Sequence, residues 1–125
     1  MEKKKVMIVD DEEDFLKITK INLEKTGRYE VRTMLDAADI VSEVKLFLPD
    51  IILLDILMPK MDGVEVCKLL KNDSAAGNIP IVTLSGLDTD KDRQIMHKLG
   101  VVDFLAKPME KDELIAKIEE VLQRK

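Results

Sequence analysis

The chain has 125 residues, 46% of them hydrophobic and 36% charged, which is the composition of a folded domain rather than of a disordered segment. Its 20 basic and 25 acidic side chains leave a net charge of −5, which argues against a domain that binds nucleic acid by itself. A single cysteine excludes an internal disulfide, and the longest purely apolar run, residues 51–54, is too short to cross a membrane. We therefore expect residues 1–125 to form one cytoplasmic domain with no membrane partner.

Short runs rich in valine and isoleucine alternate along the chain with longer runs of helical period. The first predicted strand, residues 6–9, precedes a helix that starts within residues 11–14 and ends before Gly27. The later predicted strands are residues 29–33, 51–54, 79–84 and 101–105. The later predicted helices cover about residues 36–46, the stretch after Gly63, residues 89–99 and a final stretch with an apolar stripe from Leu114 to Leu122.

Two of the predicted strands, residues 6–9 and 51–54, are apolar throughout instead of alternating. Strands buried on both faces have this pattern, so we expect them at the centre of a parallel sheet with helices on each side. The strict alternation of strand and helix predicts a doubly wound five-stranded α/β fold. In such folds the chemistry collects beyond the carboxyl ends of the strands.

Acidic residues follow two of these strands. Asp10, Asp11 and Glu12 come directly after the first strand, and Asp55 comes directly after the third. Each acid taken singly has a plain structural explanation, as a helix cap or the start of a turn. Taken together, carboxylates about 5 Å apart repel by about 3 kcal/mol at an effective dielectric constant of about 20, so a cluster favours a bound cation. Mg²⁺ is the natural candidate because it prefers hard oxygen ligands.

Thr83 lies in the fourth predicted strand and Lys107 follows the fifth. A strand threonine or a lysine after a strand is ordinary by itself. A hydroxyl, an ammonium and an acidic metal cluster at successive strand ends would together suit a phosphoryl group, because the cations neutralise its charge and the hydroxyl donates a hydrogen bond.

With these residues in place, the chain resembles the receiver domain of two-component response regulators over essentially its whole length. The matching motifs are VDDE at residues 9–12, LDILMP at 54–59, MDG at 61–63, PIVT at 80–83 and FLAKP at 104–108. The resemblance implies a flavodoxin-like fold with strand order 2-1-3-4-5 and a role in phosphorelay signal transduction. It also implies a phospho-acceptor that catalyses its own phosphorylation rather than a conventional enzyme.

The resemblance assigns the acceptor and the metal ligands residue by residue. Asp55 would be the phospho-acceptor, attacking the phosphoryl group of a sensor histidine kinase or phosphotransfer protein. Asp11, Asp55 and the backbone carbonyl of Leu57 would ligate Mg²⁺, with Asp10 assisting through water and Mn²⁺ as an alternative ion.

The resemblance also assigns the residues that would respond to phosphorylation. Lys107 would pair with the phosphoryl oxygens and Thr83 would donate to one of them. The Lys107–Pro108 bond would be a cis peptide. Phe104 would turn inward as Thr83 moves, unless it is an ordinary core aromatic, and the surface of residues 89–125 would then change for a downstream protein or effector domain. The domain would be a monomer or a phosphorylation-dependent homodimer.

Two positions depart from the commonest pattern of the family. Leu84 stands where a small residue is usual, and we expect it to narrow the entrance to the site. Leu57 is apolar where some members place a polar group that positions a hydrolytic water, so we expect slow autodephosphorylation. A Mg²⁺-dependent phosphohydrolase of the haloacid dehalogenase type is the alternative function, but such enzymes need an acid at the position of Leu57. A flavodoxin would need a hydroxyl- and glycine-rich loop after the first strand, where this chain is acidic.

Overall fold

The computed structural model describes residues 2–56, 62–84 and 90–124. Five parallel strands form one sheet in the order β2-β1-β3-β4-β5, which confirms the predicted topology. The strands are β1 (Lys4–Val9), β2 (Tyr29–Met34), β3 (Ile51–Asp55), β4 (Ile81–Leu84) and β5 (Val101–Leu105). The continuously apolar β1 and β3 are adjacent inner strands, as their sequences predict.

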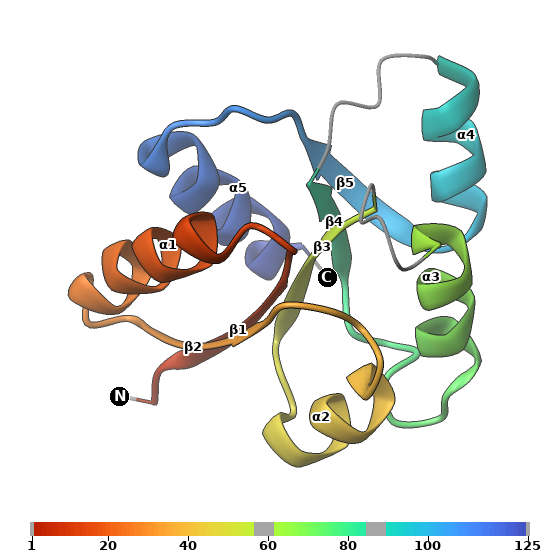
Figure 1. Ribbon diagram of the computed structural model, residues 1–125, viewed down its shortest axis with the longest axis horizontal. Coiled ribbons are helices and arrows are strands. Elements are labelled where there is room, and N and C mark those ends of the chain that lie inside the picture. Colours follow the sequence, from red (N-terminus) through yellow and green to blue (C-terminus); the bar gives the residue numbers. More distant parts are fainter. Residues whose placement is uncertain (1, 57–61, 85–89, 125) are drawn as a thin grey trace.

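Helices cover both faces of the sheet (Figure 1). They are α1 (Glu13–Lys25), α2 (Ile40–Phe47), α3 (Gly63–Asn72), α4 (Asp90–Lys98) and α5 (Lys111–Gln123). α1 and α5 lie on one face, while α2, α3 and α4 lie on the other. None of the helices described is both long and apolar enough to pass through a lipid bilayer.

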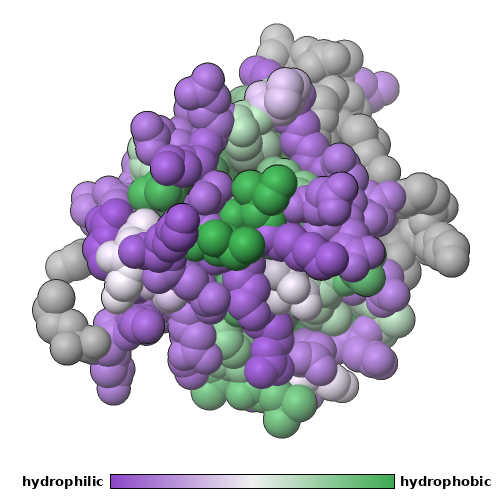
Figure 2. Space-filling model, turned by 60° about the vertical axis from the view of Figure 1, so that its left-hand side comes forward, coloured by the Kyte–Doolittle hydropathy of each residue, from purple (hydrophilic) through white to green (hydrophobic). Residues whose placement is uncertain are grey.

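The sheet separates two apolar clusters because successive strand side chains point to opposite faces. Val6 and Ile8 of β1 pack with α1 and α5, whereas Met7 and Val9 pack with α2, α3 and α4. All four side chains are fully buried. The side of the molecule that carries α1 and α5 is mostly hydrophilic, with small apolar patches between the polar side chains (Figure 2). Ile18 of α1 is one of the exposed apolar side chains.

Several element boundaries differ from the prediction, and two of these differences have a local cause. α2 begins at Ile40 instead of about residue 36, because the Asp36 carboxylate accepts a hydrogen bond at 2.9 Å from the Ala38 N–H and forms a turn there. β4 begins at Ile81 instead of Ile79, since the Ile79 N–H donates to the Ala76 carbonyl at 3.0 Å and is not part of the sheet.

The first residue of α3 lies very close to the residue after β3. A Cβ atom built on Gly63 would come within 2.5 Å of the Cβ of Ile56. Real Cβ atoms do not approach so closely, so the packing requires glycine here. The Asp62 carboxylate caps the same helix by accepting from the Val64 N–H at 2.9 Å.

Candidate functional site

Strand pairing brings the acidic residues together at the carboxyl edge of the sheet. Val9 pairs with Leu54, so Asp10, which follows β1, lies beside Asp55, which ends β3. Oxygen atoms of Asp10, Asp11 and Asp55 all lie within 4.8 Å of one another, and Asp10 and Asp55 are buried. Three carboxylates at this spacing form a group that could hold a metal ion.

The Asp10 side chain does not cap α1, which was the plain structural explanation for an acid at this position. The helix begins at Glu13 with Glu12 as N-cap and has no side-chain cap hydrogen bond. Instead, Asp10 Oδ1 accepts from the Glu12 N–H at 2.9 Å, which fixes the orientation of the carboxylate. Its second oxygen, Oδ2, is left to face Lys107.

Lys107 makes contacts with three acids at once. Its ammonium donates to Asp10 Oδ2 and, at 2.7 Å, to Glu12 Oε1, and it lies 3.5 Å from Asp55 Oδ2. The ring of Phe15, from the first turn of α1, has its centroid 4.7 Å from the same nitrogen. The Glu12 and Phe15 contacts with Lys107 were not predicted; their closeness to the acidic motif in sequence was the available signal.

Burial and charge act against each other in the pKa values of this cluster. Burial alone lowers the pKa of Lys107, but hydrogen bonds to Asp10 and Glu12, together with the nearby negative charges, raise it to about 12. Burial raises the pKa of Asp10 and outweighs the opposing hydrogen bond from Lys107. Lys107 therefore remains a cation, whereas burial makes the charged form of Asp10 less favourable than it would be in water.

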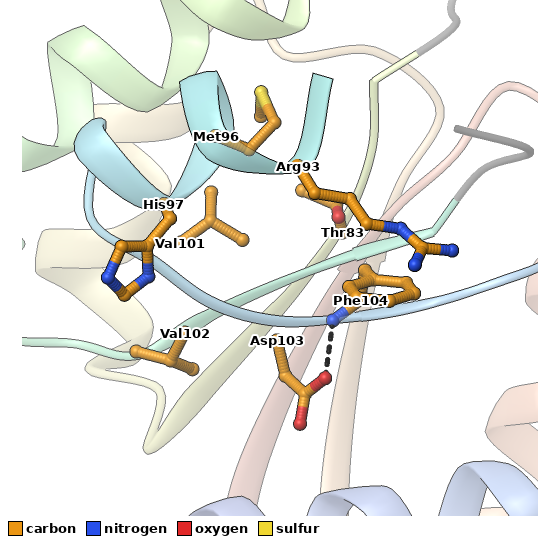
Figure 3. A pocket seen from close by; sticks show the side chains of 8 residues that line it. All are labelled: Thr83, Arg93, Met96, His97, Val101, Val102, Asp103 and Phe104. Carbon is orange, nitrogen blue, oxygen red and sulfur yellow. Dashed lines mark hydrogen bonds between the residues drawn. The ribbon is translucent and has the colours of Figure 1, made fainter. Parts of the chain in front are cut away.

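Thr83 and Phe104 are partners in the β4–β5 pairing and lie beside a cavity between α4 and β5 (Figure 3). Thr83 is 1% exposed, and its Oγ1 has no hydrogen-bond partner in the part of the chain that the structure describes. Phe104 is 36% exposed and does not fill the cavity, whose volume is about 220 Å³. A buried hydroxyl without a partner costs about 1–3 kcal/mol, so this one is available to a ligand.

The other predicted positions are placed as follows. The peptide bond between Lys107 and Pro108 is cis. Leu84 is fully buried in the cluster on the α1 and α5 face, and the narrowing of the site entrance by this residue stays a prediction. The alternation of side chains along β4 turns it away from the cavity that Thr83 lines. Leu57, the predicted carbonyl ligand, lies outside the described residues.

A family model described as the response regulator receiver domain matches residues 6–119. The chain belongs to the response regulator receiver domain family. This family is one of phospho-acceptors in two-component signalling rather than of conventional enzymes, so membership decides against the phosphohydrolase alternative.

Two curated relatives and one solved structure illustrate the similarity. The receiver domain is 36% identical over 121 residues to the alkaline phosphatase synthesis transcriptional regulatory protein PhoP of Bacillus subtilis, covering 97% of this chain and 49% of that protein. It is 39% identical over 122 residues to the probable transcriptional regulator ycf27 of Guillardia theta, covering 98% and 46%. The chain thus spans about half the length of these relatives. The structure of chemotaxis protein CheY4 of Vibrio cholerae superposes with a TM-score of 0.89 at 27% identity, covering 96% of this chain and 99% of that one.

Proposed function

We propose that this receiver domain accepts a phosphoryl group on Asp55 from a sensor histidine kinase or phosphotransfer protein. The observation that carries the proposal is the convergence of Asp10, Asp11, Asp55 and Lys107 at the ends of β1, β3 and β5. A carboxylate oxygen of Asp55 forms a bond to phosphorus, and the bond from phosphorus to the donor histidine nitrogen breaks. The nitrogen keeps the electron pair, and the product is an aspartyl phosphate.

The residues present fit a hard divalent cation, and we assign Mg²⁺, with Mn²⁺ as an alternative. Asp10, Asp11 and Asp55 would hold it, and the carbonyl of Leu57 completes the proposed ligand set. The fit rests on three carboxylates, which are hard oxygen donors, and on the burial of Asp10 and Asp55, whose charged forms a cation would stabilise. When bound, the ion supplies positive charge that offsets the charge of the phosphoryl oxygens.

Lys107 and Thr83 bind the phosphoryl group in this proposal. The Lys107 ammonium has three donors, of which Asp10 and Glu12 occupy two in the structure, and its separation of 3.5 Å from Asp55 Oδ2 exceeds a normal charge-assisted hydrogen bond. A phosphoryl group on Asp55 would compete for this ammonium. The Thr83 hydroxyl, for which the described part of the chain offers no partner, would donate to another phosphoryl oxygen.

The signal would leave the domain through α4, β5 and α5. As Thr83 moves toward the phosphoryl group, the Phe104 ring would enter the cavity, and the exposed apolar side chains Ile95 and Val102 on this face would meet a changed surface. A downstream protein or effector domain in the cytoplasm would read this change. The domain would act as a monomer or as a homodimer that forms on phosphorylation.

The test is Mg²⁺-dependent labelling by acetyl phosphate, followed by intact mass spectrometry. The wild type should gain one phosphoryl group, and Asp55→Asn should gain none. Asp36→Asn is the matched control, because it makes the same chemical change at an exposed turn and should label like the wild type. Equal labelling of wild type and Asp55→Asn would refute the assignment. Slow loss of the label, over minutes or longer, is the expected autodephosphorylation.

A further inference from the structure

The cavity between α4 and β5 is next to the Phe104 ring, yet the ring does not enter it. Met96, Val101 and Thr83 form the buried part of its lining, and more exposed side chains, Arg93 and His97 among them, form the rest. Burying an exposed phenyl ring in such surroundings is favourable, and phenylalanine has no hydroxyl that could hydrogen-bond at the surface. Some other contact must therefore favour the outward position of Phe104.

Arg93 makes that contact (Figure 3). The central carbon of its guanidinium lies 4.1 Å from the centroid of the Phe104 ring, the shortest cation–aromatic distance among the described residues. A planar guanidinium at this distance combines stacking with attraction to the ring electrons. Arg93 is on α4 and Phe104 on β5, so the contact joins the two elements that border the cavity.

The backbone of β5 is fixed from its other side. The Asp103 carboxylate accepts from the Phe104 N–H at 2.8 Å and also binds Lys117 and Arg124 of the α5 region, at 2.9 and 2.8 Å. These contacts anchor β5 to α5, whereas the ring of Phe104 is partly exposed to solvent.

We propose that Arg93 is a positioning residue that holds the Phe104 ring outside the cavity in the unphosphorylated domain. The proposal rests on the switching role given to Phe104 under the proposed function. Arg93 contacts the ring in its outward position, so it stabilises that position relative to the inward one. Phosphorylation must then displace the ring from Arg93. Loss of Arg93 reduces the free-energy difference that favours the outward position over the inward one.

The size of the effect follows from the strength of a partly exposed cation–π contact. Removing it should raise the ratio of inward to outward ring positions about two- to fivefold. By linkage, a ligand that binds only with the ring inward should bind more tightly by at most the same factor.

The experiment measures the ring position in the unphosphorylated domain by NMR, using nuclear Overhauser contacts between the Phe104 ring and the Met96 and Thr83 methyl groups. Arg93→Ala should strengthen these contacts about two- to fivefold in population. Arg93→Lys, which keeps the charge but loses the planar stack, should give a smaller increase. Gln94→Ala is the control, since Gln94 is exposed on the same helix but does not line the cavity.

Beryllofluoride with Mg²⁺, a phosphoryl mimic, provides the second readout. Its affinity should rise in Arg93→Ala relative to Gln94→Ala. Ring contacts in Arg93→Ala equal to those of wild type would overturn the proposal. If beryllofluoride bound neither protein, the proposed function would fail, but the ring measurement would still decide the role of Arg93.

Discussion

The ammonium of Lys107 already has carboxylate partners, whereas the buried hydroxyl of Thr83 lines a cavity. We call Asp10, Asp11, Asp55 and Lys107 the charged end, and Thr83, Phe104 and Arg93 the cavity end. At the charged end the ammonium of Lys107 binds Asp10 and Glu12. At the cavity end Thr83 Oγ1 has no partner among the described residues, and about 220 Å³ of space adjoins it.

The difference shows that the two ends can respond to one phosphoryl group in different ways. At the charged end, a phosphoryl group would compete for an ammonium that already donates to Asp10 and Glu12. At the cavity end, the Thr83 hydroxyl would form a hydrogen bond where it has none with the described residues, and the Phe104 ring would move into the cavity. Removal of the Lys107 ammonium should therefore destabilise the resting domain, whereas replacement of the Thr83 hydroxyl by an apolar group should leave it unharmed or more stable.

The largest expected effect is at the charged end. Lys107→Ala leaves the fully buried Asp10 without its ammonium, and we expect the free energy of unfolding at pH 7 to fall by about 3 kcal/mol. Urea denaturation without divalent cations measures it. Lys17→Ala is the control, because its pair with Glu13, at 3.1 Å, is exposed and should cost less than about 1 kcal/mol.

The double variant Lys107→Ala with Asp10→Asn tests the cause of that loss. The raised pKa of Asp10 means that the folded state binds a proton more readily than the unfolded chain, so stability falls as pH rises through the folded pKa. An asparagine removes this penalty, and the double variant should recover most of the loss at pH 7. No recovery would show that packing of the lysine stem, not its charge, was lost.

At the cavity end the sign should reverse. Thr83→Val replaces a hydroxyl that has no partner among the described residues with a methyl group, and we expect the free energy of unfolding to rise by about 1 kcal/mol. Thr26→Val should instead lose about 1 kcal/mol, because Thr26 Oγ1 donates to the Leu23 carbonyl at 2.7 Å and accepts from the Arg28 N–H at 3.1 Å. Thermal and urea unfolding compare the two, and a loss of stability in both would contradict the distinction between the ends.

The smallest expected effect concerns Glu12. Glu12→Gln removes one exposed partner of Lys107, so the pKa of Lys107 should fall from about 12 by less than about one unit. Titration of the lysine side-chain carbon signals by NMR measures this. Glu13→Gln removes the same charge one residue later, where it faces Lys17, and should leave Lys107 unchanged. An equal fall in both variants would mean that the overall negative charge of this region, not the contact with Glu12, raises the pKa of Lys107.

The alternation of strand and helix predicted the parallel α/β class, and the resemblance carried by short motifs next to the strands implied the sheet order. The convergence of the acids follows because these motifs stand at the carboxyl ends of the strands. The start of α2 was missed, since the hydrogen bond of Asp36 to Ala38 competes locally with helix and leaves no periodic signal. The contacts Arg93–Phe104 and Lys107–Phe15 could not be predicted, because they depend on side-chain conformations between elements that lie apart in sequence. The sequence also could not predict that Thr83 Oγ1 lacks a hydrogen-bond partner among the described residues, because this depends on the positions of the surrounding side chains.

The absent side chain at Gly63 limits which sequences this site tolerates. Any larger residue would push on Ile56, the direct neighbour of Asp55, and the sheet holds Asp55 in register with Leu84. A substitution of Gly63 would thus displace the backbone next to Asp55, although Gly63 carries no functional group. In a library of random variants, position 63 should therefore behave like a residue of the site, with glycine retained under selection for signalling.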